Sequence, residues 1–213
     1  MILAVDWLTV SSLATAGATL VLAFATFGAV RSANRAARAA ERSLLAGLRP
    51  VLMPSRVDDV PQKVGFSDNK WFLIEGAGAV AEVGDDAIYL AASVRNMGSG
   101  IAVLHGWYLT PDPQLGHVEH SPLERFHRLT RDLYIAANEP GFWQGAYRDP
   151  SEPEFEVARQ AILARQRLGI EILYGDHEGG QRTISWFSFS PRQDGGWTAS
   201  VARHWSIDRP DPR

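Results

Sequence analysis

In the stretch DAIYLAASVRNMGSGIAVLHGWYL, residues Asp86–Leu109, apolar side chains recur at every second position on both sides of a glycine-rich turn. A period of two is the repeat of a β-strand that places one face in a core. The pattern predicts strands over Asp86–Asn96 and Ile101–Leu109, joined by Asn96–Gly100. The side chains expected to face inward are Ile88, Leu90, Ala92 and Val94 in the first strand and Ile101, Val103, Trp107 and Leu109 in the second.

Shorter segments of the same kind fill the rest of the chain after Pro50. Strands are predicted over Val51–Met53, Trp71–Glu75, Val80–Val83, Leu133–Ala136, Phe142–Tyr147, Gly169–Tyr174, Gln181–Phe189 and Trp197–Trp205. Hairpins are expected around Gly76–Gly78 and Gly175–Gly180. Ser151–Glu154 is typical of a capping box, which predicts one helix from there to about Gln166. The sequence therefore predicts a mainly β fold, an immunoglobulin-like antiparallel β-sandwich with one inserted helix.

One segment also carries a resemblance to known proteins. VRNMGSGIAVLHGW, Val94–Trp107, is similar to the strand–turn–strand segment of immunoglobulin-like modules of the CARDB type. The whole layout, with RPVLMP at 49–54 and YGDHEGGQRTISWF at 174–187, resembles that of uncharacterised single-pass membrane proteins of actinobacteria. The resemblance implies a membrane-tethered β-domain, and it implies no catalytic residue.

The N-terminal segment is apolar. Residues 7–30, WLTVSSLATAGATLVLAFATFGAV, contain no charged side chain. As a helix they would span about 36 Å, and the hydrocarbon layer of a bilayer is about 30 Å thick. We predict a transmembrane anchor over residues 1–30. Two alternatives stay open: a cleaved signal peptide, which normally begins with basic residues and has a shorter apolar run, and a buried helix of a soluble core.

Basic residues follow the apolar segment, and none precedes it. Residues 31–49 hold five arginines and one glutamate, so the positive-inside rule predicts an N-terminus outside the inner (plasma) membrane and a cytoplasmic C-terminal domain. On a helix, the first four of these arginines form one narrow stripe opposite alanine and leucine. We expect this amphipathic juxtamembrane helix to continue the membrane helix and to end near Gly47. The β-domain is predicted over 50–206, and a disordered tail over 207–213.

The arginine stripe has two interpretations. Its side chains, with the one that follows the helix, would contact anionic lipid headgroups, at about 1 kcal/mol for each arginine near the surface. Alternatively, the stripe is a solvated face that only determines topology. The candidate lipid contacts are Arg31, Arg35, Arg38, Arg42 and Arg49. Nucleic acid is not an expected partner, because the chain after residue 49 is net acidic and the stripe lacks aromatic residues that stack on bases.

Small residues at four-residue spacing in the apolar segment, such as Ser12 and Ala16, are compatible with close helix packing in lipid. An alanine-rich composition also produces such pairs by chance. A homo-oligomer is therefore a possible assembly, and the pattern does not require one.

Three histidines form the densest group of possible metal ligands: His117, His120 and His127. Catalytic zinc needs three protein ligands and an open position, but the spacing is not that of a zinc-binding helix, and a polar surface loop explains it equally well. Asp176 and His177 lie in a predicted turn and are a second weak candidate, for acid–base chemistry. The chain has no cysteine, which excludes thiol chemistry, and no motif predicts a cofactor.

Aromatic side chains occupy both faces of one predicted strand. Trp186, Phe187 and Phe189 place one ring or more on each face. One face is therefore a candidate partner surface, and burial on both sides is the alternative.

Three functions remain open at this point. The leading hypothesis is a membrane-tethered, non-enzymatic interaction or scaffold module for a protein partner. The second is a metal-dependent or acid–base hydrolase that uses the histidines. The third is a sensor of anionic lipid that uses the arginine stripe.

Overall fold

The computed structural model describes residues 7–110 and 119–208. They fall into two compact units, divided between Ala46 and Gly47, and each unit is described by itself. Of the predicted tail over 207–213, residues 209–213 lie outside the described part of the chain.

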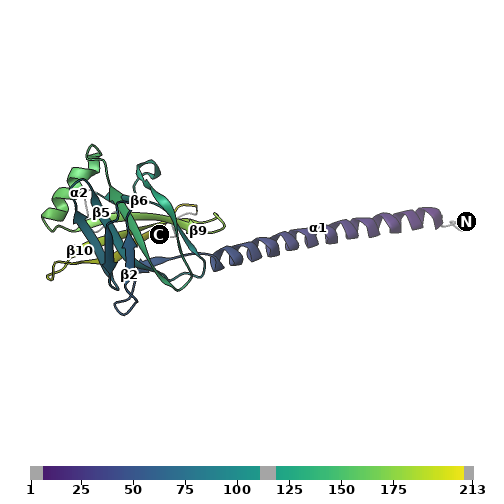
Figure 1. Ribbon diagram of the computed structural model, residues 1–213. Coiled ribbons are helices and arrows are strands. Elements are labelled where there is room, and N and C mark those ends of the chain that lie inside the picture. Colours follow the sequence, from purple (N-terminus) through teal and green to yellow (C-terminus); the bar gives the residue numbers. More distant parts are fainter. Residues whose placement is uncertain (1–6, 111–118, 209–213) are drawn as a thin grey trace, which may run out of the picture. The chain divides into compact units, whose positions relative to one another are not determined.

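The first unit is one unbroken helix, α1, Trp7–Gly47 (Figure 1). Its apolar part is long enough to cross a membrane, as predicted from the sequence. Hydroxyl groups within this part are satisfied locally: the side chains of Thr15, Thr19 and Thr26 each donate to a carbonyl four residues earlier, at 2.8–2.9 Å. The arginine-rich segment continues the same helix, and the helix ends at the glycine expected to end it.

The second unit is built from antiparallel strands, two short helical elements and their connections. The strands are β1 Leu52–Pro54, β2 Gln62–Gly65, β3 Trp71–Ile74, β4 Gly78–Val83, β5 Ile88–Asn96, β6 Ala102–Thr110, β7 His127–Ile135, β8 Pro140–Tyr147, β9 Leu168–Asp176, β10 Arg182–Pro191 and β11 Trp197–Ser206. The helical elements are the 3-10 turn η1, Leu123–Arg125, and the helix α2, Pro153–Leu163. The prediction of a mainly β, antiparallel domain with one inserted helix is confirmed at this level.

Nine strands form one hydrogen-bonded sheet. Its order is β1-β5-β4-β11-β10-β9-β6-β7, and β8 pairs with the remaining edge of β5. β5 has partner strands on both edges. β8 pairs along one edge, and β4 and β1 pair with successive parts of the other edge. β7 and β8 each have one partner strand, so both are edge strands of this sheet among the described residues.

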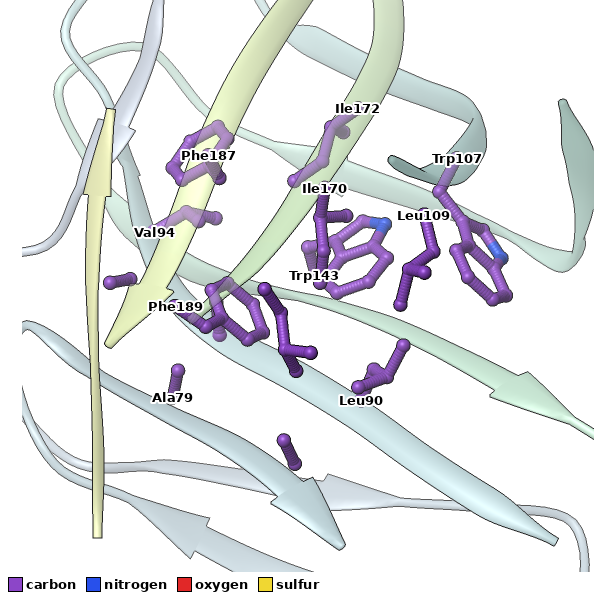
Figure 2. Packing of buried hydrophobic residues seen from close by; sticks show 14 of the residues in the cluster. Ala79, Leu90, Val94, Trp107, Leu109, Trp143, Ile170, Ile172, Phe187 and Phe189 are labelled. Carbon is purple, nitrogen blue, oxygen red and sulfur yellow. The ribbon is translucent and has the colours of Figure 1, made fainter. Parts of the chain in front are cut away.

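The inner faces of these strands share one aromatic core. Figure 2 shows residues of β5 and β8 packed against residues of β9 and β10. The Trp143 ring meets the Phe189 ring at 6.1 Å and the Trp107 ring at 5.7 Å, both edge to face. α2 covers part of this core with three side chains at helical spacing, Phe155, Ala158 and Ile162, as its sequence pattern predicted.

A second, smaller sheet packs on the outer face of β5. It consists of β2 and β3, which pair from Gln62 with Ile74 to Gly65 with Trp71. The sequence predicted that the segment containing β3 would pair with the segment containing β4, and this is wrong. β4 pairs with β5 and β11 instead, so the glycines between β3 and β4 connect two sheets.

A β-bulge corrects the predicted orientation of β6. The pairing of β6 with β7 and β9 shifts register between Leu104 and Gly106, so one extra residue reverses the alternation. Ala102 and Leu104 therefore face the core before the bulge, whereas Ile101, expected to face inward, is 38% exposed. The inward positions of Trp107 and Leu109, after the bulge, are confirmed.

The start of α2 also differs from its prediction. The Ser151 hydroxyl donates to the Asp149 carboxylate at 2.7 Å and does not cap the helix. The helix begins at Pro153 with Glu152 at the N-cap position, and no side chain caps it. It ends at Leu163, three residues before the predicted end. The acidic side chains of its first turn still suit the positive end of the helix dipole.

Candidate binding cleft

The predicted lipid-contact arginines lie on the expected structure. Four of them lie on α1 with their side chains exposed, and Arg49 is exposed just after the helix. Over the 11 residues from Arg31 to Arg42 a helix rises about 16 Å, which is about twice the Debye length at physiological salt. The stripe is therefore present, but its members lie at different distances from the apolar part of the helix.

The predicted aromatic partner surface is buried. Trp186 is 2% exposed, and Phe187 and Phe189 are not exposed at all. The two phenylalanines belong to the main core, while Trp186 packs on the opposite face with Ile184 and Trp205. The connection before β7 covers that face, because Leu123 and Phe126 pack against Trp186 and its neighbours. Both sides of β10 are thus interior, and the prediction of an exposed aromatic surface there is wrong.

The histidine cluster does not assemble among the described residues. His117 lies outside them. The ring centre of His120 lies 6.1 Å from that of Trp205, and the His127 ring stacks on Trp107 with 4.8 Å between ring centres. The two tryptophans belong to different hydrophobic clusters, so their histidines are separated. No group of three metal-ligating side chains occurs within residues 7–110 and 119–208.

The other acid–base candidate has a structural role. Asp176 is 2% exposed, and its Oδ1 accepts from the Gly180 amide at 3.0 Å, which closes the turn between β9 and β10. His177 is exposed and lies 3.3 Å from Glu178. The two side chains therefore face different environments and do not form a catalytic pair.

A cleft of about 360 Å³ lies where β7 approaches β8. Side chains from both edge strands line it, and the β2–β3 hairpin and the N-cap of α2 contribute to the rim. Opposite the bulge of β6, the regular pairing of β7 with β6 is interrupted between Arg128 and Leu133. This irregular segment of β7 forms one wall of the cleft. The cleft is thus a consequence of strand irregularity at the sheet edge.

His127 lies at the inner end of the cleft. Its ring stacks on Trp107 and meets the Tyr147 ring edge to face at 5.1 Å. Its Nδ1 is 3.5 Å from the Glu152 carboxylate, and its buried Nε2 has no hydrogen-bond partner among the described residues. Burial raises the pKa of the Tyr147 phenol, so that group stays protonated. The rings of Trp107, His127 and Tyr147 thus form one aromatic cluster that borders the cleft.

Three arginines give the cleft a net positive charge. Arg148 is paired with Asp68 at 2.8 Å. Arg131 donates to neutral oxygens, Gln144 Oε1 at 2.9 Å and Gly65 O at 3.4 Å. Within the described part of the chain, neither Arg131 nor Arg128 forms an ion pair with a carboxylate, and the one acidic lining residue, Glu152, faces His127.

Sequence reasoning identified one residue of this cleft, His127, and assigned it to a different kind of site. Arg128 and Arg131 lie in HRLTRD, 127–132, which precedes the strand predicted over Leu133–Ala136. Gln144 and Gly65 approach Arg131 only in the folded chain. The one sequence feature that could have indicated this site is the pair of arginines. Basic residues are common on edge strands that bind no ligand, so the pair by itself predicts no site.

Next to the cleft, the outer face of the β2–β3 hairpin is apolar and exposed. Trp71 is 57% exposed and Leu73 is 70% exposed. The Trp71 ring lies over Gly65, and the Lys63 ammonium lies 4.9 Å from the ring centre. In the connection before β2, Val57 and Val60 are also more than two-thirds exposed. Exposed apolar groups of this size beside positive charge are typical of a contact surface.

Comparison of the chain with protein-family models, with curated proteins and with solved structures gave no match. The resemblance to CARDB-type modules therefore remains an expectation. Three features of the chain bear on its function: the long apolar helix, the cleft and the exposed hairpin face.

Proposed function

We propose that this chain is a membrane-tethered, non-enzymatic interaction module that contacts a protein partner through the outer face of the β2–β3 hairpin. One observation carries the proposal: Trp71 and Leu73 are exposed side by side on a small sheet whose other face packs against the outer face of β5. The hairpin therefore keeps its shape without a partner and offers a preformed apolar face.

Charge specifies the kind of partner. Lys63 lies over Trp71, Arg131 reaches Gly65 beneath it, and neither cation is paired with a carboxylate among the described residues. A partner surface that combines apolar and acidic side chains complements this arrangement. The long apolar helix supports the membrane location, and the arginines after it favour the cytoplasmic side.

Site-directed crosslinking tests this function, since the chain has no cysteine of its own. A Leu73→Cys variant labelled with a photoactivatable maleimide should give a discrete adduct in membranes, and a further Trp71→Ser change should abolish it. Glu178→Cys, on the exposed β9–β10 turn, is the matched control. Equal adducts from both positions, or an adduct unaffected by Trp71→Ser, would contradict the proposed surface.

A second candidate function is recognition of anionic lipid by the arginine stripe, because the helix does present these side chains together. The rise of the helix predicts a gradient: Arg31 and Arg35 lie nearest the apolar segment and Arg42 lies farthest. Arg31→Gln with Arg35→Gln should weaken binding to vesicles containing phosphatidylserine more than Arg42→Gln does. Equal effects, or binding that is insensitive to salt, would reject this function.

The immunoglobulin-like character of the β-domain is also a proposal. We propose an immunoglobulin-like sandwich, in which β5 and β8 face β9 and β10 across the core. The support is the antiparallel pairing throughout and the shared aromatic interior.

A further inference from the structure

The cleft between β7 and β8 holds cationic groups that the fold does not neutralise. Arg131 donates hydrogen bonds to the Gln144 amide oxygen and to the Gly65 backbone carbonyl, both uncharged. Arg128 lines the same cleft without an ion pair among the described residues. A guanidinium has five donors arranged to match an oxyanion, and a bond to a charged acceptor is stronger than one to a neutral acceptor. Arg131 is therefore positioned to exchange its neutral partner for an anion.

The size of the cleft restricts what that anion is. A volume of about 360 Å³ is at the lower end of the range of small-molecule sites. Its walls combine the arginines with apolar groups, Leu129 and Leu133 on one strand and Ala146 on the other. Trp107 beneath them is 2% exposed and cannot move aside. This composition favours a compact ligand with one charged end and a short apolar body.

We propose that this cleft is a binding site for a small organic anion, whose carboxylate or phosphate group is held by Arg131 and Arg128. The apolar body of the ligand lies against Leu129, Leu133 and Ala146. Gln144 keeps Arg131 in place while the site is empty. The proposal goes beyond the protein-contact surface and is tested separately from it. Trp71 and Arg131 border both sites, but the contact surface is carried by Trp71 and Leu73, whereas the anion site is carried by Arg131 and Arg128.

The test measures binding of defined probes to the purified full-length chain by intrinsic tryptophan fluorescence. Benzoate and phenyl phosphate supply the two kinds of oxyanion on the same ring, and benzamide is the neutral counterpart. At least one of the anions should give a saturable signal, with benzamide at least about tenfold weaker because a charge-assisted bond is lost. The stronger of the two anions identifies the class of charged group.

Two variants distinguish a loss of anion binding at the cleft from a loss of folding. Gln144→Glu preserves side-chain size and supplies Arg131 with an internal carboxylate, so it should weaken anion binding at least about tenfold while Tm stays the same or rises. Arg131→Gln should weaken binding similarly. Arg192→Gln is the matched control, because Arg192 pairs with Asp194 at the turn between β10 and β11, outside the cleft lining.

Two results would overturn the proposal. One is the absence of saturable binding by either anion to the unaltered chain. The other is binding to Gln144→Glu and Arg131→Gln that equals binding to Arg192→Gln. Neither result bears on the hairpin surface, which the crosslinking from position 73 tests separately.

Discussion

At the scale of single residues, Asn96 organises three segments of the chain. It is fully buried at the end of β5. Its Oδ1 accepts from the amides of Val51 at 3.1 Å and Gly98 at 3.0 Å. Its Nδ2 donates to the carbonyls of Gly100 at 2.6 Å and Ile135 at 3.1 Å. The glycine-rich turn that opens β6 is thus held from within by one amide side chain.

Asn96→Ala should lower the free energy of unfolding by about 3 kcal/mol, because it leaves several backbone groups without partners in a buried place. Denaturant titration of the full-length chain measures this value. Ser99→Ala, in the same turn but exposed, is the control and should change stability by less than about 0.5 kcal/mol. If the two variants lost equal stability, the proposed role of the Asn96 side chain would be wrong.

At the scale of elements, an ion pair fastens the β2–β3 hairpin to the main sheet. Asp68, in the hairpin turn, accepts a hydrogen bond from the Tyr89 hydroxyl of β5 and pairs with Arg148, which follows β8, at 2.8 Å. These two contacts, the hydroxyl first, lower the pKa of Asp68 to about 2. Phe66 and Phe72 pack against the Tyr89 ring beneath them. The exposed hairpin face is therefore supported by both packing and charge.

A pH dependence follows from the lowered pKa of Asp68. The folded carboxylate holds its proton less tightly than the unfolded one, so its contribution is complete above the unfolded pKa of about 4 and is lost as pH falls toward 2. The difference in unfolding free energy between the unaltered chain and Asp68→Asn should shrink between about pH 5 and pH 2. Tyr89→Phe should remove part of the same dependence. A difference that is constant with pH would contradict this assignment.

At the scale of the whole molecule, a long apolar helix and a folded domain occupy separate parts of one chain. The helix has 41 residues, and its apolar part begins near the N-terminus. The apolar part of this helix is exposed in the isolated chain, and a lipid bilayer would cover it. The core of the β-domain is drawn entirely from residues after the helix.

The prediction at the scale of the whole molecule concerns membrane topology, that is, the side of the membrane on which the β-domain lies. One cysteine added after Arg213 should react with a membrane-impermeant maleimide only after cells are lysed, because the positive-inside rule predicts that the arginines after the apolar segment face the cytoplasm. The chain has no other cysteine, so the label reports one site. Labelling of intact cells would reverse the orientation and place the cleft and the hairpin outside the cytoplasm.

Several parts of this protein could be predicted from local sequence patterns alone. α1 and its end at Gly47, the hairpin of β9 and β10, and the last strand are all properties of residues that are neighbours in sequence. Helical and strand periods depend on backbone geometry over a few residues, and glycine and proline interrupt them directly. The sequence alone therefore determined an apolar helix long enough to span a membrane, a basic continuation and a β-rich domain.

Tertiary structure alone decided strand partners, burial and the candidate site. A period of two shows that a strand has an inner face, but it does not show which strand lies beside it, so β3 was assigned the wrong partner. It also does not show what covers each face, so one face of β10 remained a candidate partner surface, although distant Leu123 packs against the cluster around Trp186. Arg131 of β7 donates to the Gly65 carbonyl of β2 across 66 residues of chain, and this contact exists only because the fold brings together these two strands of different sheets.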